Sequence, residues 1–285
     1  MKTPLKKLSE NIWAKLDFEN PTGSAKYRPA LYIVQDAFNK GLISEGGTVI
    51  EATSGNTGIA LAYVAKKYKC NAVIVMPSNM SPERITLIES YGGKVVLTPA
   101  EKGMQGAVDK SVELKNTISN SFIADQFNNP ENVRSHYETT GSEIYEQTNS
   151  KVDVFIAGIG TGGTISGVGK YLKQKNPNIK IIGVEPSSSP LINKGWAGQH
   201  KIQGIGANFI PSILDKSVID EIIDISDDDA IEYTKKLIKE ENIQAGISSG
   251  AAYFAALEVA KRPEMKNKQI VVFFTDKADR YDLKD

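Results

Sequence analysis

Apolar runs bounded by glycine, asparagine, serine and proline alternate along the chain with amphipathic stretches. The apolar runs are rich in β-branched residues and apolar on both faces, which is typical of strands covered on both sides. They predict strands over residues 12–18, 48–51, 72–76, 94–97, 152–157, 179–184 and 269–274. The amphipathic stretches predict helices over residues 25–39, 58–67, 82–91, 106–115, 136–148, 162–173 and 227–241. This alternation predicts an α/β fold with mainly parallel sheets flanked by helices.

Composition narrows the class of protein. With 285 residues, 40% hydrophobic and 24% charged, the chain is an ordinary globular protein with room for two lobes or one large domain. Lys and Arg total 34, as do Asp and Glu, which argues against nucleic acid or an anionic membrane as the main partner. No signal peptide or membrane helix is expected, and Cys70 is the single cysteine. We therefore expect a cytoplasmic protein.

A polar turn, Thr53-Ser54-Gly55-Asn56-Thr57, lies between a predicted strand and the helix that starts near Gly58. Ligands of parallel α/β sheets bind at the carboxyl ends of strands. The helix N-terminus there offers unpaired N–H groups and a partial positive charge, and the hydroxyl groups add donors. The turn therefore suits a carboxylate or a phosphate. An ordinary helix cap explains the same residues equally well.

A second turn, Gly160-Thr161-Gly162-Gly163-Thr164, follows the predicted strand 152–157 and opens another helix. Its glycines allow close approach to an anion and its threonines can donate hydrogen bonds, although a tight packing turn is the alternative. It is neither a Walker motif nor a dinucleotide fingerprint, so a phosphate without a nucleotide fits best. Lys26, at a helix start, could form a Schiff base if the fold partly buries it. Together the three segments indicate pyridoxal phosphate chemistry on an amino acid.

These segments belong to a set of motifs through which essentially the whole chain resembles the cysteine synthases (O-acetylserine sulfhydrylases), fold-type II pyridoxal phosphate enzymes. The motifs are Asn-Pro-x-Gly-Ser-x-Lys-x-Arg at 20–28, Thr-Ser-Gly-Asn-Thr-Gly at 53–58, Met-Pro-x-x-Met-Ser-x-Glu-Arg at 76–84, Asp-Gln-Phe-Asn-Asn-Pro at 125–130, Gly-Thr-Gly-Gly-Thr at 160–164 and Gly-Ile-Ser-Ser-Gly at 246–250. The resemblance implies two lobes of the tryptophan synthase β-like type. Residues 20–130 would form a smaller mobile lobe, and residues 1–19 with 131–285 a larger lobe that binds the cofactor phosphate.

The resemblance also implies roles for individual residues. Lys26 carries the Schiff base with pyridoxal 5'-phosphate and acts as general base, and no metal takes part. The other implied cofactor residues are Asn56 at the ring hydroxyl, Gly160, Thr161, Gly162, Gly163 and Thr164 at the phosphate, and Thr275 at the pyridine nitrogen, with Asp276 as the alternative. The implied substrate residues are Thr53, Ser54, Thr57, Gln126 and Gly204.

The implied reaction is a transferase β-replacement that makes L-cysteine from O-acetylserine, or another activated serine, and sulfide or thiosulfate. It passes through an α-aminoacrylate while the cofactor serves as electron sink. The alternatives are cystathionine β-synthase, another β-replacement or β-elimination enzyme (a lyase) acting on cysteine or serine, and a non-catalytic relative. The implied partners are a second copy of the chain in a homodimer and a serine acetyltransferase.

Some features depart from the family pattern. Tyr27 stands where the family usually has aspartate, and Thr275-Asp276 replaces the usual Pro-Ser or Cys-Asp. Compared with the family pattern, the N-terminus begins later and the chain ends sooner. The later N-terminus is expected to reduce the contacts within the dimer. Subfamily signals conflict between the A-type, the B-type and the cystathionine β-synthase relatives, which leaves the second substrate open.

The histidines and tryptophans are assigned separately. His136 and His200 are far apart in the sequence and have no cysteine cluster, so a metal site is not expected. His136 is expected to cap or pack its helix. His200 lies in the glycine-rich stretch 195–206, which is an active-site loop or a plain surface loop, and it is the histidine that we expect to face substrate. Trp13 and Trp196 are expected to pack.

Overall fold

The computed structural model describes residues 1–281 and residue 283. The chain divides into two compact units, and each is described by itself. Met1–Ala25 together with Val133–Asp285 form what we call the large unit, and Lys26–Asn132 form the small unit. Each unit has its own sheet, and all strand pairs are parallel except β1 with β2. The predicted α/β fold is confirmed.

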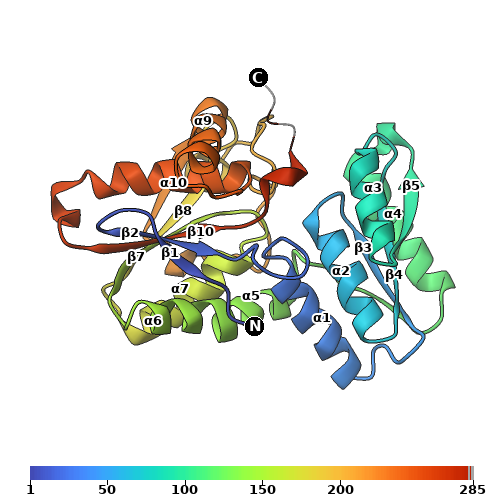
Figure 1. Cartoon of the computed structure of the whole chain (residues 1–285). Coiled ribbons are helices and arrows are strands. Elements are labelled where there is room, and N and C mark those ends of the chain that lie inside the picture. Colours follow the sequence, from blue (N-terminus) through green and yellow to red (C-terminus); the bar gives the residue numbers. More distant parts are fainter. Residues whose placement is uncertain (282, 284–285) are drawn as a thin grey trace. The chain divides into compact units, whose positions relative to one another are not determined.

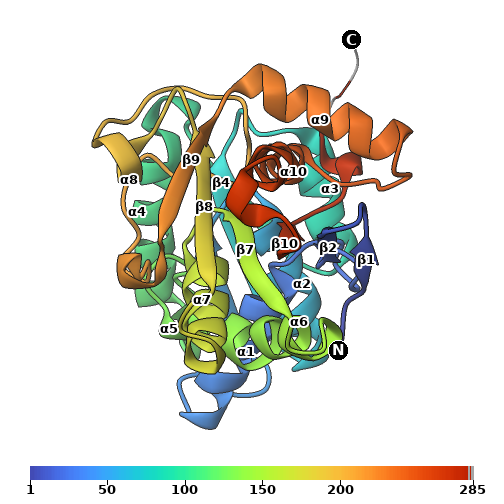
Figure 2. The same ribbon diagram turned by 90° about the vertical axis from the view of Figure 1, so that its left-hand side faces the viewer.

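The six strands of the large unit follow the order β1-β2-β10-β7-β8-β9. They are β1 (Leu5–Lys7), β2 (Ile12–Leu16), β7 (Val152–Gly158), β8 (Lys180–Pro186), β9 (Glu221–Ile225) and β10 (Gln269–Phe274). Val271 of β10 lies opposite both Trp13 and Phe155, so the central strand is paired on both edges. Figure 2 shows β7, β8 and β9 side by side.

Helices cover both faces of this sheet (Figure 1). The long helices are α7 (Gly163–Lys175), α9 (Asp227–Lys239) and α10 (Ile247–Ala260). The shorter elements are α6 (Ser142–Gln147), α8 (Leu191–Lys194), the π-helical turn η2 (His136–Gly141) and the 3-10 turns η3 (Lys216–Val218), η4 (Pro263–Met265) and η5 (Ala278–Arg280). The helix α5 (Pro130–Ser135) spans the division between the two units. Alternate strand residues serve the two faces: Ile156 and Val272 pack with α9 and α10, whereas Phe155 and Phe273 pack with α6 and α7.

The small unit has a four-stranded sheet with the order β5-β4-β3-β6. Its strands are β3 (Thr48–Ala52), β4 (Asn71–Pro77), β5 (Lys94–Thr98) and β6 (Ser121–Ile123). Its helices are α1 (Tyr27–Asn39), α2 (Asn56–Lys67), α3 (Pro82–Ser90), η1 (Ala100–Lys102) and α4 (Gly103–Thr117). Val49 and Ile74 pack on the α1, α2 and α3 side, whereas Ile50 and Val75 face α4, which explains why these strands are apolar on both faces.

All seven predicted strands and all seven predicted helical regions are present, with η2 and α6 together filling the region 136–148. The strands β1, β6 and β9 are not among the predicted elements, and the first two have three residues each. The helices α5, α8 and the long α10 are not among them either. Most residues of α10 are buried, so apolar side chains surround it and no amphipathic pattern marks it.

The two tryptophans differ from one another. Trp13 packs against the core shared with α6 and α7, as expected. The expectation for Trp196 is wrong, because this side chain is 49% exposed. It lies just after α8, in the loop that runs without helix or strand to η3. A large apolar residue in a glycine-rich loop does not by itself indicate burial.

Candidate functional site

The turn after β3 forms the first part of the site, in the small unit. Thr53 donates its backbone N–H to the Val75 carbonyl (3.0 Å), and its hydroxyl oxygen accepts the N–H of Gly55 (3.2 Å). Arg84 Nη1 donates to the Ser54 carbonyl (2.9 Å). These contacts fix the turn at the carboxyl ends of β3 and β4, where α2 begins at Asn56. The Gly58 N–H donates to the N-cap carbonyl of Gly55 (3.1 Å), whereas the N–H groups before it in the first turn have no acceptor within the helix, so the turn can bind an anion.

Gln126 is brought to this turn from a part of the chain far along the sequence. The Thr57 hydroxyl donates to Gln126 Oε1 at 2.5 Å, and Asn132 Nδ2 donates to the Gln126 carbonyl at 2.8 Å. Gln126 is 5% exposed, so this contact is shielded from solvent. The small unit therefore brings Thr53, Ser54 and Thr57 together with Gln126. Because the Thr57 hydroxyl proton points to Gln126, we assign the backbone N–H of Thr57, rather than its hydroxyl, to an anion.

Lys26 is the N-cap residue of α1 and is half-buried. The prediction that it starts a helix is confirmed, and α1 packs on α2 within the small unit. The residue before it, Ala25, donates its backbone N–H to the Thr275 carbonyl at 2.7 Å. Tyr27, the family departure, is 8% exposed and contacts the ring of Tyr63 edge-on, so it is a core residue of the small unit.

The glycine-rich turn between β7 and α7 forms the second part of the site, in the large unit. Gly162 has a φ of +83°, a left-handed conformation that favours glycine. The Thr161 hydroxyl oxygen accepts the N–H of Gly163 at 3.3 Å. A Cβ on Gly160 would lie 2.3 Å from the Gly204 carbonyl oxygen, so only glycine permits this approach. The turn thus forms the N-terminus of the 13-residue helix α7 and brings Gly204 beside it.

His136 is expected from the sequence only to cap or pack its helix, but the structure makes it a functional candidate. Its ring is 2% exposed, with Nε2 lying 3.2 Å from Thr164 Oγ1 and Nδ1 lying 2.9 Å from Thr140 Oγ1. Phe273 contacts the ring edge-on. The π-helical turn η2 begins at His136, and such turns are frequent at functional sites. The sequence offers one signal for this role, a histidine within the predicted helix 136–148, which packs against α7.

Thr275 and Asp276 follow β10 and have different surroundings. The Thr275 N–H donates to Ser249 Oγ (3.1 Å), and its side chain is half-buried. Asp276 is 1% exposed, and its Oδ2 accepts the Tyr281 hydroxyl at 2.5 Å. Ser249 lies in the first turn of α10, within the Gly-Ile-Ser-Ser-Gly motif, so this motif holds the end of β10 in place.

The geometry of the glycine-rich turn fits the phosphate of pyridoxal phosphate. The turn supplies two threonine hydroxyls and the N-terminus of a long helix, and its glycines carry no side chain that would keep an anion from the backbone. No group of histidine, cysteine and acidic residues that could hold a metal ion occurs in the part of the chain that the structure describes. In the same described part, none of the helices has the length and apolar character needed to span a bilayer.

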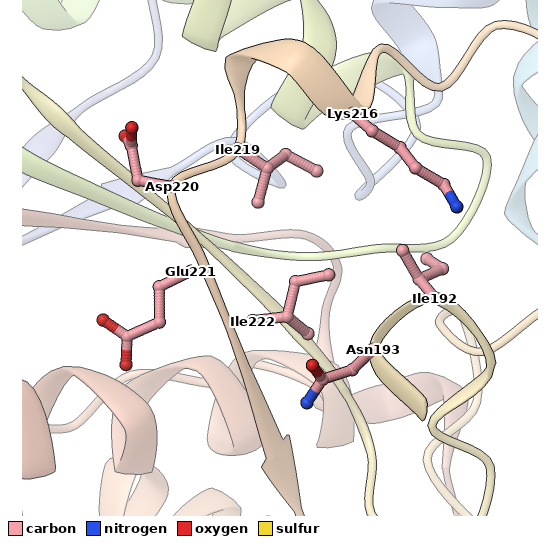
Figure 3. A pocket seen from close by; sticks show the side chains of 7 residues that line it. All are labelled: Ile192, Asn193, Lys216, Ile219, Asp220, Glu221 and Ile222. Carbon is pink, nitrogen blue, oxygen red and sulfur yellow. The ribbon is translucent and has the colours of Figure 1, made fainter. Parts of the chain in front are cut away.

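A surface pocket of the large unit, about 400 Å³ in volume, lies between α8, η3 and β9 (Figure 3). Ile192, Ile219 and Ile222 line it together with polar side chains. Figure 3 shows Lys216 and the carboxylates of Asp220 and Glu221 pointing away from one another. Lys173 pairs with Asp220 at 2.8 Å and Arg262 pairs with Glu221 at 2.6 Å. These carboxylates already serve ion pairs, and none of the predicted site residues lines the pocket.

Comparison with known proteins identifies the family. A sequence model described as pyridoxal-phosphate dependent enzyme matches residues 1–276. Cysteine synthase B of Campylobacter jejuni is 48% identical over 277 residues, which are 97% of this chain and 92% of that protein. The chain belongs to the cysteine synthase family of pyridoxal-phosphate dependent enzymes.

Solved structures agree with this family assignment. The cysteine synthase of Entamoeba histolytica has a TM-score of 0.94 at 40% identity, covering 98% of this chain and 86% of that one. A hydrogen sulfide-producing enzyme of Fusobacterium nucleatum has a TM-score of 0.93 at 46% identity, covering 98% and 96%. The chain is therefore an enzyme with pyridoxal phosphate as its cofactor, and the predicted family, fold and cofactor are confirmed.

Proposed function

We propose that the chain makes L-cysteine from O-acetylserine and sulfide. The observation that carries this proposal is the polar turn Thr53–Thr57 with Gln126 held against it. A turn at a helix N-terminus with an added amide is suited to the carboxylate of an amino acid. Family membership supplies the cofactor chemistry, and bound pyridoxal phosphate withdraws the electrons that are released when the substrate loses its Cα proton.

The residues of the two units take separate roles in this proposal. Gly160, Thr161, Gly162, Gly163 and Thr164 hold the phosphate, Asn56 meets the ring hydroxyl, and Thr275 meets the pyridine nitrogen. Thr53, Ser54, Thr57 and Gln126 orient the substrate carboxylate, and Gly204 lines the substrate side. Lys26 would hold the cofactor through its aldehyde. When free, Lys26 Nζ would take the Cα proton of the substrate and later return one, as a general base and acid. We also propose that residues 20–130 move as one lobe on carboxylate binding, which excludes water.

Product analysis tests this function. The purified enzyme with pyridoxal phosphate should form cysteine from O-acetylserine and sulfide, and more slowly form cystathionine from serine and homocysteine. Faster formation of cystathionine would favour a cystathionine β-synthase, and pyruvate from serine alone would favour a dehydratase. Thiosulfate in place of sulfide tests the second sulfur donor.

A second candidate function is release of hydrogen sulfide from L-cysteine. It is favoured by the likeness to the hydrogen sulfide-producing enzyme of Fusobacterium nucleatum, which covers nearly all of both chains at 46% identity. The same carboxylate site and the same lysine serve both reactions, because the two differ in the group that leaves Cβ. Sulfide formed from cysteine, compared with cysteine formed from O-acetylserine at equal enzyme concentration, separates them.

We further propose a cytoplasmic homodimer that a serine acetyltransferase can bind, as the family resemblance implies. Light scattering of the purified protein measures the number of copies. Co-elution with a serine acetyltransferase from the same cell tests the partner. A monomer that does not co-elute would remove both proposals without affecting the proposed reaction.

A further inference from the structure

Glu51 is a buried acid within the apolar strand β3 and has no role in the proposed function. Glu51 is 3% exposed. The backbone ladder between β3 and β6 ends when Ala124 donates to the Ile50 carbonyl (2.9 Å). The Glu51 carboxylate then accepts the next two N–H groups, those of Asp125 (2.7 Å, to Oε2) and Gln126 (3.3 Å, to Oε1). The carboxylate therefore replaces backbone acceptors at the point where the chain turns away from the sheet.

The turn that Glu51 holds includes a residue with an unusual backbone conformation. Asp125 adopts a left-handed conformation with a φ of +51°, which is unusual for a residue other than glycine. Asn129 Nδ2 donates to the Ala124 carbonyl (3.0 Å), and Asn132 Nδ2 donates to the Gln126 carbonyl (2.8 Å). These bonds hold the carbonyl groups of the turn, whereas Glu51 holds its N–H groups. Together they direct the Gln126 side chain toward α2.

The Gln126 amide has one oxygen and one nitrogen, and its neighbours distinguish them. Oε1 accepts the Thr57 hydroxyl at 2.5 Å. The backbone N–H of Gln126 donates to Glu51 Oε1 at 3.3 Å. With Oε1 turned to Thr57, the amide nitrogen of Gln126 is the group that can donate to a ligand.

We propose that Glu51 is a positioning residue, which fixes the orientation of the Gln126 amide so that an N–H group is presented to the carboxylate of the amino-acid substrate. The proposal rests on the proposed function, in which Gln126 contacts that carboxylate. Nε2 has two hydrogens that can donate. Their direction is set by the contact of Oε1 with Thr57 and by the backbone hydrogen bonds through which Glu51 holds the turn. A site built this way favours a carboxylate over an amide or ester at the same position.

Burial raises the pKa of the Glu51 carboxyl to about 7, while the hydrogen bonds from Gln126 and Asp125 act in the opposite direction. The Asp125 carboxylate raises it further. Burial without a cationic partner is costly for a carboxylate, and only hydrogen-bond donors offset the cost. The charge state of the Glu51 carboxyl therefore depends on these hydrogen bonds, unlike that of a solvated acid on the surface.

The test compares Glu51→Gln with Glu185→Gln in the enzyme reconstituted with pyridoxal phosphate. Glu185 is a matched control: it is 1% exposed and accepts two backbone N–H groups, those of Ile192 (3.1 Å) and Asn193 (2.8 Å). E51Q should lower kcat/KM for O-acetylserine about tenfold, the effect of one charge-assisted hydrogen bond, and leave kcat/KM for sulfide within about twofold. E185Q should leave both values within about twofold.

Two further measurements separate positioning from a general loss of structure. Calorimetry with 3-acetoxypropanoate, which has the carboxylate and ester of O-acetylserine but no amine, should show an about tenfold higher Kd for E51Q. In a Gln126→Ala background, E51Q should add less than about twofold, because the residue through which it acts is gone. If E51Q does not fold, Glu51→Asp keeps the charge but is one methylene shorter, and it should lower kcat/KM for O-acetylserine several-fold.

The proposal is overturned if E51Q, or E51D in its place, leaves kcat/KM for O-acetylserine unchanged. It is also overturned if both substrates are affected equally, or if E51Q and Q126A act independently. A failure of the proposed function looks different, since the unmodified enzyme itself would then form no cysteine from O-acetylserine and sulfide.

Discussion

His136 Nε2 lies 3.2 Å from Thr164 Oγ1, and the ring's other nitrogen lies 2.9 Å from Thr140 Oγ1. If Thr164 donates its hydroxyl proton to the cofactor phosphate, as proposed, its oxygen must accept from His136, which therefore carries its proton on Nε2. Nδ1 then accepts the Thr140 hydroxyl. The buried histidine thus orients a hydroxyl of the glycine-rich turn.

Replacing His136 with asparagine should weaken cofactor binding. The shorter side chain cannot reach Thr164, so Kd for pyridoxal phosphate, measured by absorbance titration of the apoenzyme, should rise about fivefold, the equivalent of one hydrogen bond. Tyr137→Phe is the matched control, because it removes an exposed hydrogen bond to Gln174 from the neighbouring residue. Equal Kd values for H136N and the unmodified enzyme would refute the role of His136.

Gly160→Ala should abolish cofactor binding in a protein that still folds. The added Cβ would meet the Gly204 carbonyl oxygen at 2.3 Å, so the turn or the loop around Gly204 must move. Gly195→Ala is the control, since nothing lies within 4 Å of its added Cβ and only its left-handed φ of +84° is strained. Circular dichroism checks folding and absorbance checks bound cofactor. Full cofactor content in G160A would contradict this account of the turn.

Glu143→Ala should destabilise the large unit by on the order of 3 kcal/mol, because it removes a carboxylate that pairs with a buried ammonium. Lys15 is 0% exposed, and its Nζ lies 2.6 Å from Glu143 Oε2, 2.7 Å from the Thr3 carbonyl and 2.8 Å from Gln147 Oε1. Urea unfolding measures the loss. The exposed pair of Lys69 and Glu45 (3.0 Å) provides the comparison, and E45A should cost less than about 0.5 kcal/mol. Similar losses in the free energy of unfolding for E143A and E45A would contradict a special contribution of the buried pair.

Glu51 should make stability depend on pH. Its pKa is about 7 in the folded chain and near the ordinary 4.5 in the unfolded chain, with Asp125 as its charged neighbour. The folded state therefore holds the proton more tightly. The resulting stabilisation is complete below pH 4.5 and is lost as the pH rises through 7.

Urea unfolding of the unmodified protein and of E51Q, between about pH 5 and 8, measures this effect. The difference in free energy of unfolding, unmodified minus E51Q, should fall over that range, because glutamine does not titrate. Asp125→Asn should move the fall to lower pH by removing a like charge. A difference that stays constant with pH would mean that Glu51 keeps an ordinary pKa.

Much of the fold follows from local patterns in the sequence. Strands such as 72–76 are continuous runs of β-branched and apolar residues, and helices such as 25–39 carry an amphipathic face with a clear end. α10 was missed because it is apolar all round, and β1 and β6 because three residues are too few to show a period. An element could therefore be predicted from the sequence only when it was long enough to show a periodic pattern.

The site was predictable only in part, for a similar reason. The turns at 53–57 and 160–164 lie within single short segments, so their glycines and hydroxyl groups could be read directly. The contacts of Glu51 with Gln126 and of His136 with Thr164 join residues 75 and 28 positions apart. Such pairings depend on strand order and helix packing. An acid inside the apolar strand Thr48–Ala52 was the one local sign that β3 carried more than core residues.

The central claim is that Lys26 is the residue linked to pyridoxal phosphate. The reconstituted enzyme can be reduced with borohydride, which makes the link permanent, and then digested and analysed by mass spectrometry. The account predicts a pyridoxyl phosphate group on the peptide that contains Lys26, and none in Lys26→Ala. A label on another lysine, or no label in an enzyme that makes cysteine, would contradict it.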